Sequence, residues 1–376
     1  MGRMRLLLIG TFTAFMLLSG CEEGGLPTSS APAGNSPTST PTPTPNLSPS
    51  PSPKVVSTLA GSVAGNLDGT GTEARFRWPF GVAVAGDQSL IVSDRLNHRI
   101  RRISPLGEVS ALAGSLDGVA GEANAMSPEA RFNDPQGVAI DASGSIYVAD
   151  SGNHRIRVIR EDGSVETFAG STPGFADGAT SSAQFQSPAG IALDANRNLL
   201  VADRDNHRIR RITSLGEVET LTGGAAGFVD GPRSAARFNH PQGLYMAADG
   251  FAYVADSNNH SIRKVTPSGE VTTLAGNGTP GHADGIGTAA LFRHPIGLTG
   301  DEAGYLYVAD WGNNCIRRVQ IATGAVTTLA GTTKAGYLDG GLSTALFNLP
   351  TGIARTSSGS LIVVDYGNHR IRRITP

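Results

Sequence analysis

Aspartate, histidine and arginine, which can act as acid, base and anion-binding group, recur at fixed spacing in this chain. Aspartates open a D-x-x-N phrase at Asp94, Asp150, Asp203, Asp256, Asp310 and Asp365. A histidine follows the asparagine at His98, His154, His207, His260 and His369. An arginine stands later in each copy, at Arg101, Arg157, Arg210, Arg263, Arg317 and Arg372. Because every copy carries the set, we expect structural roles: Asp and Asn bond the amides of a tight turn. The arginines are expected to pair with these aspartates between neighbouring copies.

Three other histidines suggest a metal site as the alternative. His240 and His294 occupy equivalent positions in adjacent copies, and His282 lies in the connection between them. Three histidines can bind a catalytic zinc ion. However, no cysteine or glutamate cluster accompanies them, and G-x-S-x-G and H-E-x-x-H motifs are absent. We therefore predict no cofactor and favour a protein without enzymatic activity. The alternative is a channel-centred, metal-dependent lyase, hydrolase or lactonase-like enzyme that holds a divalent metal.

These residues belong to one pattern that is repeated six times between Lys54 and the C-terminus. Each copy contains P-x-G, an apolar run, D-x-x-N, an Arg-rich segment and V-x-x-L-A-G, which together indicate four short strands. The sixth copy lacks its V-x-x-L-A-G strand, and the missing strand stands at the other end, at Val56–Gly61. We therefore predict an all-β, six-bladed β-propeller of four-stranded blades, with an N-terminal strand completing the last blade.

The first 53 residues have the composition of a targeting segment and a spacer. Residues 1–20 contain two arginines and then an apolar stretch, as a signal peptide does. The sequence Leu18-Ser19-Gly20-Cys21 resembles the lipobox of bacterial lipoproteins, which implies lipidation of Cys21 and attachment to a membrane. Residues 21–53 form a Pro/Ser/Thr-rich tether; recognition by a proline-binding module or glycosylation is an alternative role for it. We expect residues 54–376 to form the propeller, displayed in the cell envelope outside the cytoplasm, either periplasmic or at the cell surface.

The repeats also resemble a known family. Asn97-His98-Arg99-Ile100, Asn153-His154-Arg155-Ile156, Asn206-His207-Arg208-Ile209 and Asn368-His369-Arg370-Ile371 look like NHL repeats, and the P-x-G opening of each copy agrees. The resemblance implies a six-bladed propeller. It implies little about activity, because this family includes binding platforms, sensor domains of membrane proteins and a few enzymes.

Strand parity predicts where a site would lie. The D-x-x-N turns and the connections of about 20 residues between copies should share one face, here called the loop face, because strand direction alternates within each blade. On that face the informative positions are those that vary among copies. They are Trp78, Phe80, Gln136, His240, Gln242, His294, Trp311 and Tyr366.

The aromatic members come from three neighbouring blades, and exposed Trp and Tyr often anchor ligands. We therefore predict a lipid-anchored binding or scaffold protein that recognises a protein, peptide or glycan on the loop face. The alternatives are that the aromatic side chains merely cover the channel mouth, or that the protein is a spacer of the cell envelope. A formal net charge of −2 and 16% charged residues argue against nucleic acid as partner, and we expect a monomer.

Overall fold

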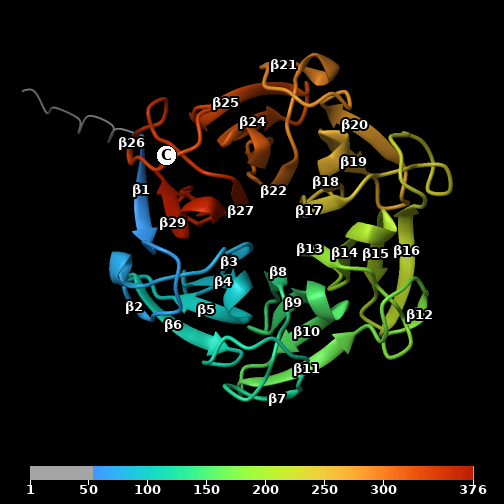
Figure 1. Ribbon diagram of the computed structural model, residues 1–376. Helices are drawn as coiled ribbons and strands as arrows, with labels where there is room; N and C mark the ends of the chain where they lie inside the picture. Colours follow the sequence, from blue (N-terminus) through green and yellow to red (C-terminus); the bar gives the residue numbers. More distant parts are fainter. Residues whose placement is uncertain (1–53, 376) are drawn as a thin grey trace, which may run out of the picture. The chain divides into compact units, whose positions relative to one another are not determined.

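The computed structural model describes residues 54–375, and the predicted signal peptide, the tether and Cys21 lie outside this range. The described chain forms six antiparallel sheets arranged as blades around a channel, which confirms the predicted all-β, six-bladed propeller (Figure 1). Within residues 54–375 no helix is long and apolar enough to cross a membrane.

Four strands run from the channel outward in every blade. Blade 1 contains β3 (Val82–Val84), β4 (Leu90–Asp94), β5 (Arg99–Ile103) and β6 (Glu108–Ala113). Blade 2 contains β8 (Pro135–Ile140), β9 (Ile146–Asp150), β10 (Arg155–Ile159) and β11 (Ser164–Ala169). Blade 3 contains β13 (Pro188–Leu193), β14 (Leu199–Asp203), β15 (Arg208–Ile212) and β16 (Glu217–Gly223). Blade 4 contains β17 (Pro241–Met246), β18 (Ala252–Asp256), β19 (Ser261–Val265) and β20 (Val271–Ala275). Blade 5 contains β22 (Pro295–Gly300), β23 (Tyr305–Asp310), β24 (Cys315–Gln320) and β25 (Ala325–Gly331). Blade 6 contains β27 (Pro350–Arg355), β28 (Leu361–Asp365), β29 (Arg370–Ile374) and β1 (Val55–Ala60).

Five of the six sheets carry a fifth, outermost strand of two residues, which the sequence analysis did not predict. These strands are β2 (Gly69–Thr70), β7 (Ala125–Met126), β12 (Gly178–Ala179), β21 (Gly285–Ile286) and β26 (Gly340–Gly341). Each lies in the long connection that leads into its own blade. In blade 4 the connection makes only a single bridge, between Gly231 and Val271. The blades therefore have four or five strands, because the connection folds back onto the outer strand.

Short 3₁₀ helices form the D-x-x-N turns on the loop face. They are η2 (Arg95–Asn97), η3 (Ser151–Asn153), η4 (Arg204–Asn206), η5 (Ser257–Asn259), η7 (Trp311–Asn313) and η8 (Tyr366–Asn368). Two more, η1 (Gly71–Glu73) and η6 (Gly287–Ala289), lie in connections between blades.

Strand β1 closes the ring as predicted. It pairs with β29, with Val56 opposite Ile374 and Thr58 opposite Arg372, and Figure 1 shows the two ends of the described chain side by side. Val56 and Ala60 of this strand are fully buried in two different apolar clusters. The N-terminal strand thus contributes to the core of the last blade and to its contact with the first.

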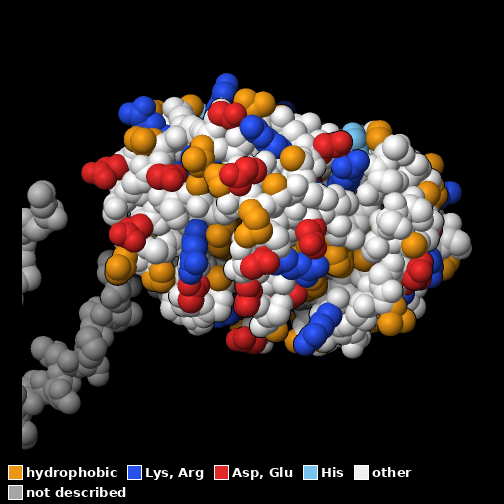
Figure 2. All heavy atoms as spheres, turned by 90° about the horizontal axis from the view of Figure 1, so that it is seen from below, with side chains coloured by type: hydrophobic (Ala, Val, Ile, Leu, Met, Phe, Trp, Pro, Cys, Tyr) orange, Lys and Arg blue, Asp and Glu red, His pale blue; other side chains and the backbone are white. Residues whose placement is uncertain are grey.

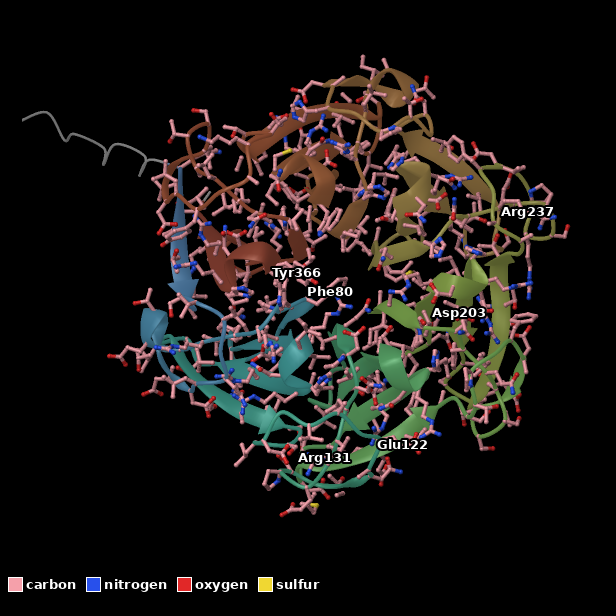
Figure 3. The ribbon with its side chains drawn as sticks, viewed as in Figure 1. Phe80, Glu122, Arg131, Asp203, Arg237 and Tyr366 are labelled. Atoms are coloured by element: carbon pink, nitrogen blue, oxygen red, sulfur yellow. The ribbon has the colours of Figure 1, made fainter. Side chains whose placement is uncertain are left out.

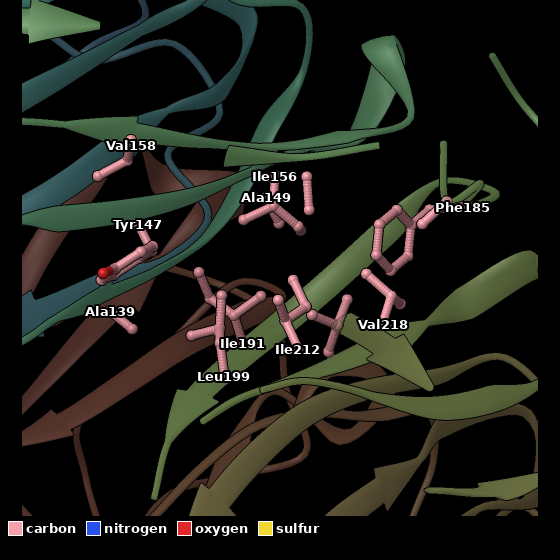
Figure 4. Close-up of a cluster of buried hydrophobic side chains, with 13 residues drawn as sticks. Ala139, Tyr147, Ala149, Ile156, Val158, Phe185, Ile191, Leu199, Ile212 and Val218 are labelled. Carbon is pink, nitrogen blue, oxygen red and sulfur yellow. The ribbon is translucent and has the colours of Figure 1, made fainter. Parts of the chain in front are cut away.

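The apolar core lies between neighbouring blades. Figure 4 shows the cluster between blades 2 and 3, where Tyr147 and Ile156 of blade 2 face Ile191 and Leu199 of blade 3. Both faces of each inner sheet are covered in this way, and the five residues of β14 are accordingly all buried. This explains why the strands have continuous apolar runs rather than strict alternation.

Each blade contains the same buried ion pair. In blade 3, Arg210 is fully buried, and its Nη1 donates to Asp203 of the D-x-x-N turn at 2.7 Å. Its Nη2 donates to Asp177 of the preceding connection at 2.5 Å, and its guanidinium lies 5.1 Å from the ring centre of Phe185. The arginine therefore holds the turn and the connection of one blade together.

This arrangement confirms the structural role of the repeated aspartates and arginines but corrects the predicted pairing. Arg157 and Asp150, for example, belong to the same sheet, so the ion pair lies within a blade and not between blades. The physical reason is the strand register, which places the arginine beside the turn that ends the adjacent strand. Burial raises the pKa of Asp150 to about 6, opposed by hydrogen bonds from Asn133, Arg157 and Asn153. The carboxylate is therefore mostly ionised at neutral pH.

The P-x-G glycines are required by close approach between neighbouring inner strands. A Cβ at Gly190 would lie 2.1 Å from the backbone oxygen of Gln242, and one at Gly243 would lie 2.2 Å from that of Ile296. No other residue type fits there without movement of the backbone. The inner strands therefore pack directly against one another around the channel.

The repeated histidine accepts a hydrogen bond from the next blade, across the interface between the two blades. The Nδ1 of His260 accepts from the backbone N–H of His294 at 3.1 Å, and the Nδ1 of His154 accepts from that of Ser187 at 3.0 Å. In blade 5 the same bond is accepted by the side-chain oxygen of Asn314 from Leu349, at 3.0 Å. Since Nδ1 must accept, these histidines stabilise the ring only in the neutral form.

The hydrogen bond that the histidine accepts between blades should make the protein sensitive to acid, and asparagine at this position should reduce that sensitivity. Burial, assisted by the nearby His294 and Arg293, lowers the pKa of His260 to about 4 from its ordinary 6.5. The unfolded chain therefore binds the proton first, and this contribution to stability is lost as the pH falls from 6.5 toward 4. H260N, which copies Asn314, should lose about 1–2 kcal/mol less than the parent between pH 7 and pH 4.

Urea unfolding at the two pH values measures this difference. The parent and H260N contain the same buried aspartates, so the effect of these groups on the pH dependence cancels in the comparison. The reverse change, Asn314→His, should make the protein more acid-sensitive. Identical pH dependence of H260N and the parent would contradict a neutral histidine at this position.

Candidate binding site at the channel mouth

Most of the predicted site residues meet at one hollow on the loop face. This hollow, here called the mouth pocket, has a volume of about 350 Å³ and opens over the central channel. Six of the eight predicted residues line it: Phe80, Gln136, Gln242, His294, Trp311 and Tyr366. They come from five different blades, so only closure of the ring brings them together.

Aromatic side chains form one wall of the mouth pocket. Phe80 and Tyr366 lie near the centre of the ring (Figure 3), with ring centres 6.3 Å apart and planes almost perpendicular. Arg95 lies beside both rings, and its Nη1 donates to the Tyr366 hydroxyl at 3.0 Å. Trp311 lines the pocket from blade 5 and makes an edge contact with His294 at 6.0 Å. All four aromatic residues predicted for the site are half-buried.

Trp78 and His240 do not line the mouth pocket but support residues that do. Trp78 packs against Tyr366 with ring centres 4.6 Å apart. His240 packs against His207, and its Nδ1 lies 2.9 Å from the side chain of Asn258, a lining residue. Both precede a proline and have left-handed backbone conformations, with φ values of 54 and 50. The residue before the proline has this left-handed conformation in all six blades, because its N–H donates the hydrogen bond to the preceding blade.

The opposite wall carries two glutamine side chains with free acceptors. Gln136 is 1% exposed, and its Nε2 donates to Ser151 at 3.2 Å and to Asp134 at 3.3 Å. Its Oε1 is buried and has no partner, and the same holds for the Oε1 of Gln242. Buried carbonyls normally have hydrogen-bond partners, so these two atoms have unused acceptor capacity.

The charged groups of the mouth pocket are already paired. Arg95 forms a two-point ion pair with Asp134, and Arg204 pairs with Asp205 at 2.8 Å. The remaining lining side chains are neutral amides, hydroxyl, imidazole, apolar and aromatic groups. The pocket therefore offers hydrogen bonds and aromatic surface rather than a free charge.

The three histidines of the metal alternative do not form a cluster. His282 Nε2 lies 3.1 Å from the hydroxyl of Thr328 in the outer part of blade 5, whereas His294 packs against His260 at 4.4 Å. Among residues 54–375 no group of three or more His, Cys, Asp or Glu side chains is placed to hold a metal ion. The hypothesis that His240, His282 and His294 share a metal is therefore wrong, because the connection carries His282 away from the channel mouth.

Two other hollows differ in character from the mouth pocket. The channel below it is narrow, about 90 Å³, and is lined by glycine, aliphatic side chains, Phe80 and Gln242. A groove of about 590 Å³ between blades 1 and 2 lies on the opposite face. There Ile91 occupies the strand position held by Tyr147 in blade 2 and Tyr253 in blade 4. An aliphatic side chain fills less space there than tyrosine, and the same position holds Leu200 in blade 3 and Ile362 in blade 6.

Sequence reasoning did not select five residues that also line the mouth pocket. These are Arg95, Arg204, Ser257, Asn258 and Ile296. All five occupy variable positions of the repeat that also supplied selected residues, namely the D-x-x-N turn and the residue before the P-x-G glycine. The same rule, applied without favouring aromatic and histidine residues, would have found them.

The fold and the site define a closed six-bladed propeller with a pocket at the loop-face end of its channel. The NHL-repeat family model matches residues 132–159, 185–212, 238–265 and 347–374, each of which spans the inner three strands of a blade. The chain belongs to the NHL-repeat β-propellers.

Known proteins are similar over most of this chain. Bovine NHL repeat-containing protein 2 is 32% identical over 323 residues, which cover 75% of this chain and 44% of that protein. The chain thus spans less than half the length of curated relatives such as this one.

Among solved structures, a protein of unknown function from Bacteroides thetaiotaomicron has a TM-score of 0.67 at 25% identity, covering 86% of this chain and 76% of that one. An auxiliary nutrient binding protein from the same organism has a TM-score of 0.65 at 18% identity, covering 85% and 76% of the two chains. These likenesses show the shared propeller fold.

Proposed function

We propose that this protein is a binding or scaffold propeller that recognises its ligand at the mouth pocket. The observation that carries the proposal is the convergence of residues that vary among the six repeats on one hollow, where two buried carbonyls lack partners. Repeated residues maintain the fold, so a concentration of non-repeated polar and aromatic residues in one concavity is the feature expected of a ligand site. That a propeller of the same fold is described as nutrient-binding supports a binding role. The three histidines that suggested a metal-dependent enzyme are not placed to share a metal ion among residues 54–375.

We propose further that Cys21 is lipidated and anchors the protein outside the cytoplasm, with residues 21–53 as the tether. This proposal rests on the lipobox-like sequence before Cys21, which lies outside the described residues. On the side of the ring shown in Figure 2, Lys and Arg side chains are intermixed with Asp and Glu, so this side presents no uniformly basic surface. The protein would then bind its protein, peptide or glycan ligand in the cell envelope, outside the cytoplasm.

Binding at the mouth pocket predicts that Tyr366→Ala and Trp311→Ala impair ligand binding more than folding. Each truncation should cost about 2 kcal/mol of binding free energy, since half-buried aromatic residues at the centre of a pocket are typical hot spots. Tryptophan fluorescence can measure binding of a defined panel of peptides and saccharides, because both tryptophans of the chain lie at or beside the pocket. In Y366A, Trp78 and Trp311 remain as probes.

Exposed Leu215, at the turn between β15 and β16, provides a control for the aromatic truncations, and L215A should bind as the parent does. Chemical denaturation of the same variants separates lost binding from lost folding. Loss of more than about 3 kcal/mol of unfolding free energy in both aromatic variants would show that these residues are core and would contradict the binding site.

The anchor predicts a simple change in partition. Cys21→Ser should move the protein from the membrane fraction to the soluble fraction after cell disruption, because no thiol remains at the lipobox position to receive lipid. Mass spectrometry of the mature N-terminus provides the second measurement. An unchanged membrane fraction, with a mature chain that begins at a residue other than Cys21, would overturn the lipoprotein proposal.

A further inference from the structure

We infer that the ligand of the mouth pocket is a neutral saccharide, bound with one face on the aromatic wall and its hydroxyl groups on Gln136 and Gln242. This inference rests on the proposed function, because it names the ligand class of the same pocket. The carrying observation is the pairing of opposite walls: Phe80, Tyr366 and Trp311 on one side, and two unpartnered glutamine carbonyls on the other.

The glutamine wall requires a ligand that donates hydrogen bonds. The Oε1 atoms of Gln136 and Gln242 are buried without partners, and leaving a buried carbonyl unpaired is unfavourable. A purely apolar ligand would leave both carbonyls unpaired, whereas a ligand hydroxyl group could satisfy them. A ligand hydroxyl group can donate to the carbonyl while it accepts from the amide of Asn258 or the hydroxyl of Ser257.

The charges around the pocket favour an uncharged ligand. An anion would face two carbonyl oxygens, while the guanidinium groups of Arg95 and Arg204 are already held by Asp134 and Asp205. A cation would need a free carboxylate, and both carboxylates beside the pocket are engaged by these arginines. A neutral polar ligand can enter the pocket without breaking either of these ion pairs and without a charged partner of its own.

The shape of the site favours a compact ring over an extended peptide. Peptides commonly bind by pairing with a free strand edge. Here the inner strands pack edge to edge, so that the N–H of Gly352 already donates to the oxygen of Phe80 at 2.8 Å. A sugar ring instead presents a flat C–H face to aromatic side chains and hydroxyl groups around its rim. An aromatic wall facing an amide wall satisfies both surfaces at once.

The test uses neutral monosaccharides and disaccharides, including glucose, galactose, N-acetylglucosamine, maltose and lactose, with the chain from Lys54 onward. At least one should change tryptophan fluorescence saturably. Gln136→Leu and Gln242→Leu should each weaken that binding about tenfold or more while the unfolding midpoint stays within a few degrees. Gln320→Leu, which alters a glutamine at the opposite face of blade 5, should leave binding unchanged. If one glutamine variant fails to fold, the other still tests the inference.

The outcomes separate the ligand class from the proposed function. Peptides that bind with dependence on Tyr366, together with saccharides that do not bind, would overturn the saccharide and leave the mouth pocket as the binding site. Saccharide binding that is unchanged in both glutamine variants and in Y366A would overturn both the saccharide inference and the mouth pocket as the binding site. Absence of binding by every saccharide up to about 100 mM would overturn the saccharide inference.

Discussion

Arg210→Met should lower the free energy of unfolding by about 3–5 kcal/mol, because it removes one partner of a buried ion pair. Asp203 is fully buried and would lose the guanidinium that lies 2.7 Å from its carboxylate. The backbone oxygens of Gln184 and Ala176 would also lose the donors now at 2.9 and 2.7 Å. Methionine fills part of the volume over Phe185 but donates no hydrogen bond. Urea unfolding monitored by circular dichroism measures the change.

The next residue on the same strand supplies the matched control. Arg211 points to the other side of β15 and pairs with partly exposed Glu219 at the surface, so Arg211→Met should cost less than about 1 kcal/mol. Equal losses in the two variants would contradict the assignment of the repeated arginine as the buried tie between turn and connection. The six blades have the same contact, so the corresponding change at Arg263 should have a similar effect.

Removal of strand β1 should have a comparably large effect on the whole ring. A chain that begins at Gly61 lacks Val55–Ala60, whereas a chain that begins at Lys54 retains it. Loss of the strand exposes the edge of β29, empties the sites of Val56 and Ala60, and removes the hydrogen bond from the N–H of Thr58 to Asp339 at 3.0 Å. We expect the shorter chain to lose on the order of 5 kcal/mol of stability or to aggregate.

Complementation sharpens this comparison. A synthetic peptide of residues 54–61, added to the chain that begins at Gly61, should restore its melting temperature in a concentration-dependent way, because it can pair with β29. A peptide with Val56 and Ala60 replaced by aspartate should fail to restore it. Equal melting temperatures of the two chains without peptide would mean that this strand does not close the ring.

The repeat made much of the fold accessible from the sequence. Strand order within a blade depends on local turns, and the missing sixth copy of V-x-x-L-A-G had a single candidate at Val56–Gly61. Periodicity also separated repeated residues from varied ones, which led to six residues of the mouth pocket. The predicted pairing of arginine with aspartate between blades was wrong, because sequence spacing alone does not distinguish an adjacent strand from an adjacent blade.

The repeat unit, the number of blades and the closing strand can all be read from the sequence, because hydrogen-bonded turns and apolar runs are encoded locally. Which of the varied residues share a pocket is set by contacts between blades. Tyr366 lines it and Trp78 lies behind it, although both belong to the predicted aromatic sector. His282 is held away from it by its connection. Contacts of this kind depend on how side chains from different blades pack around the channel, which no single repeat specifies.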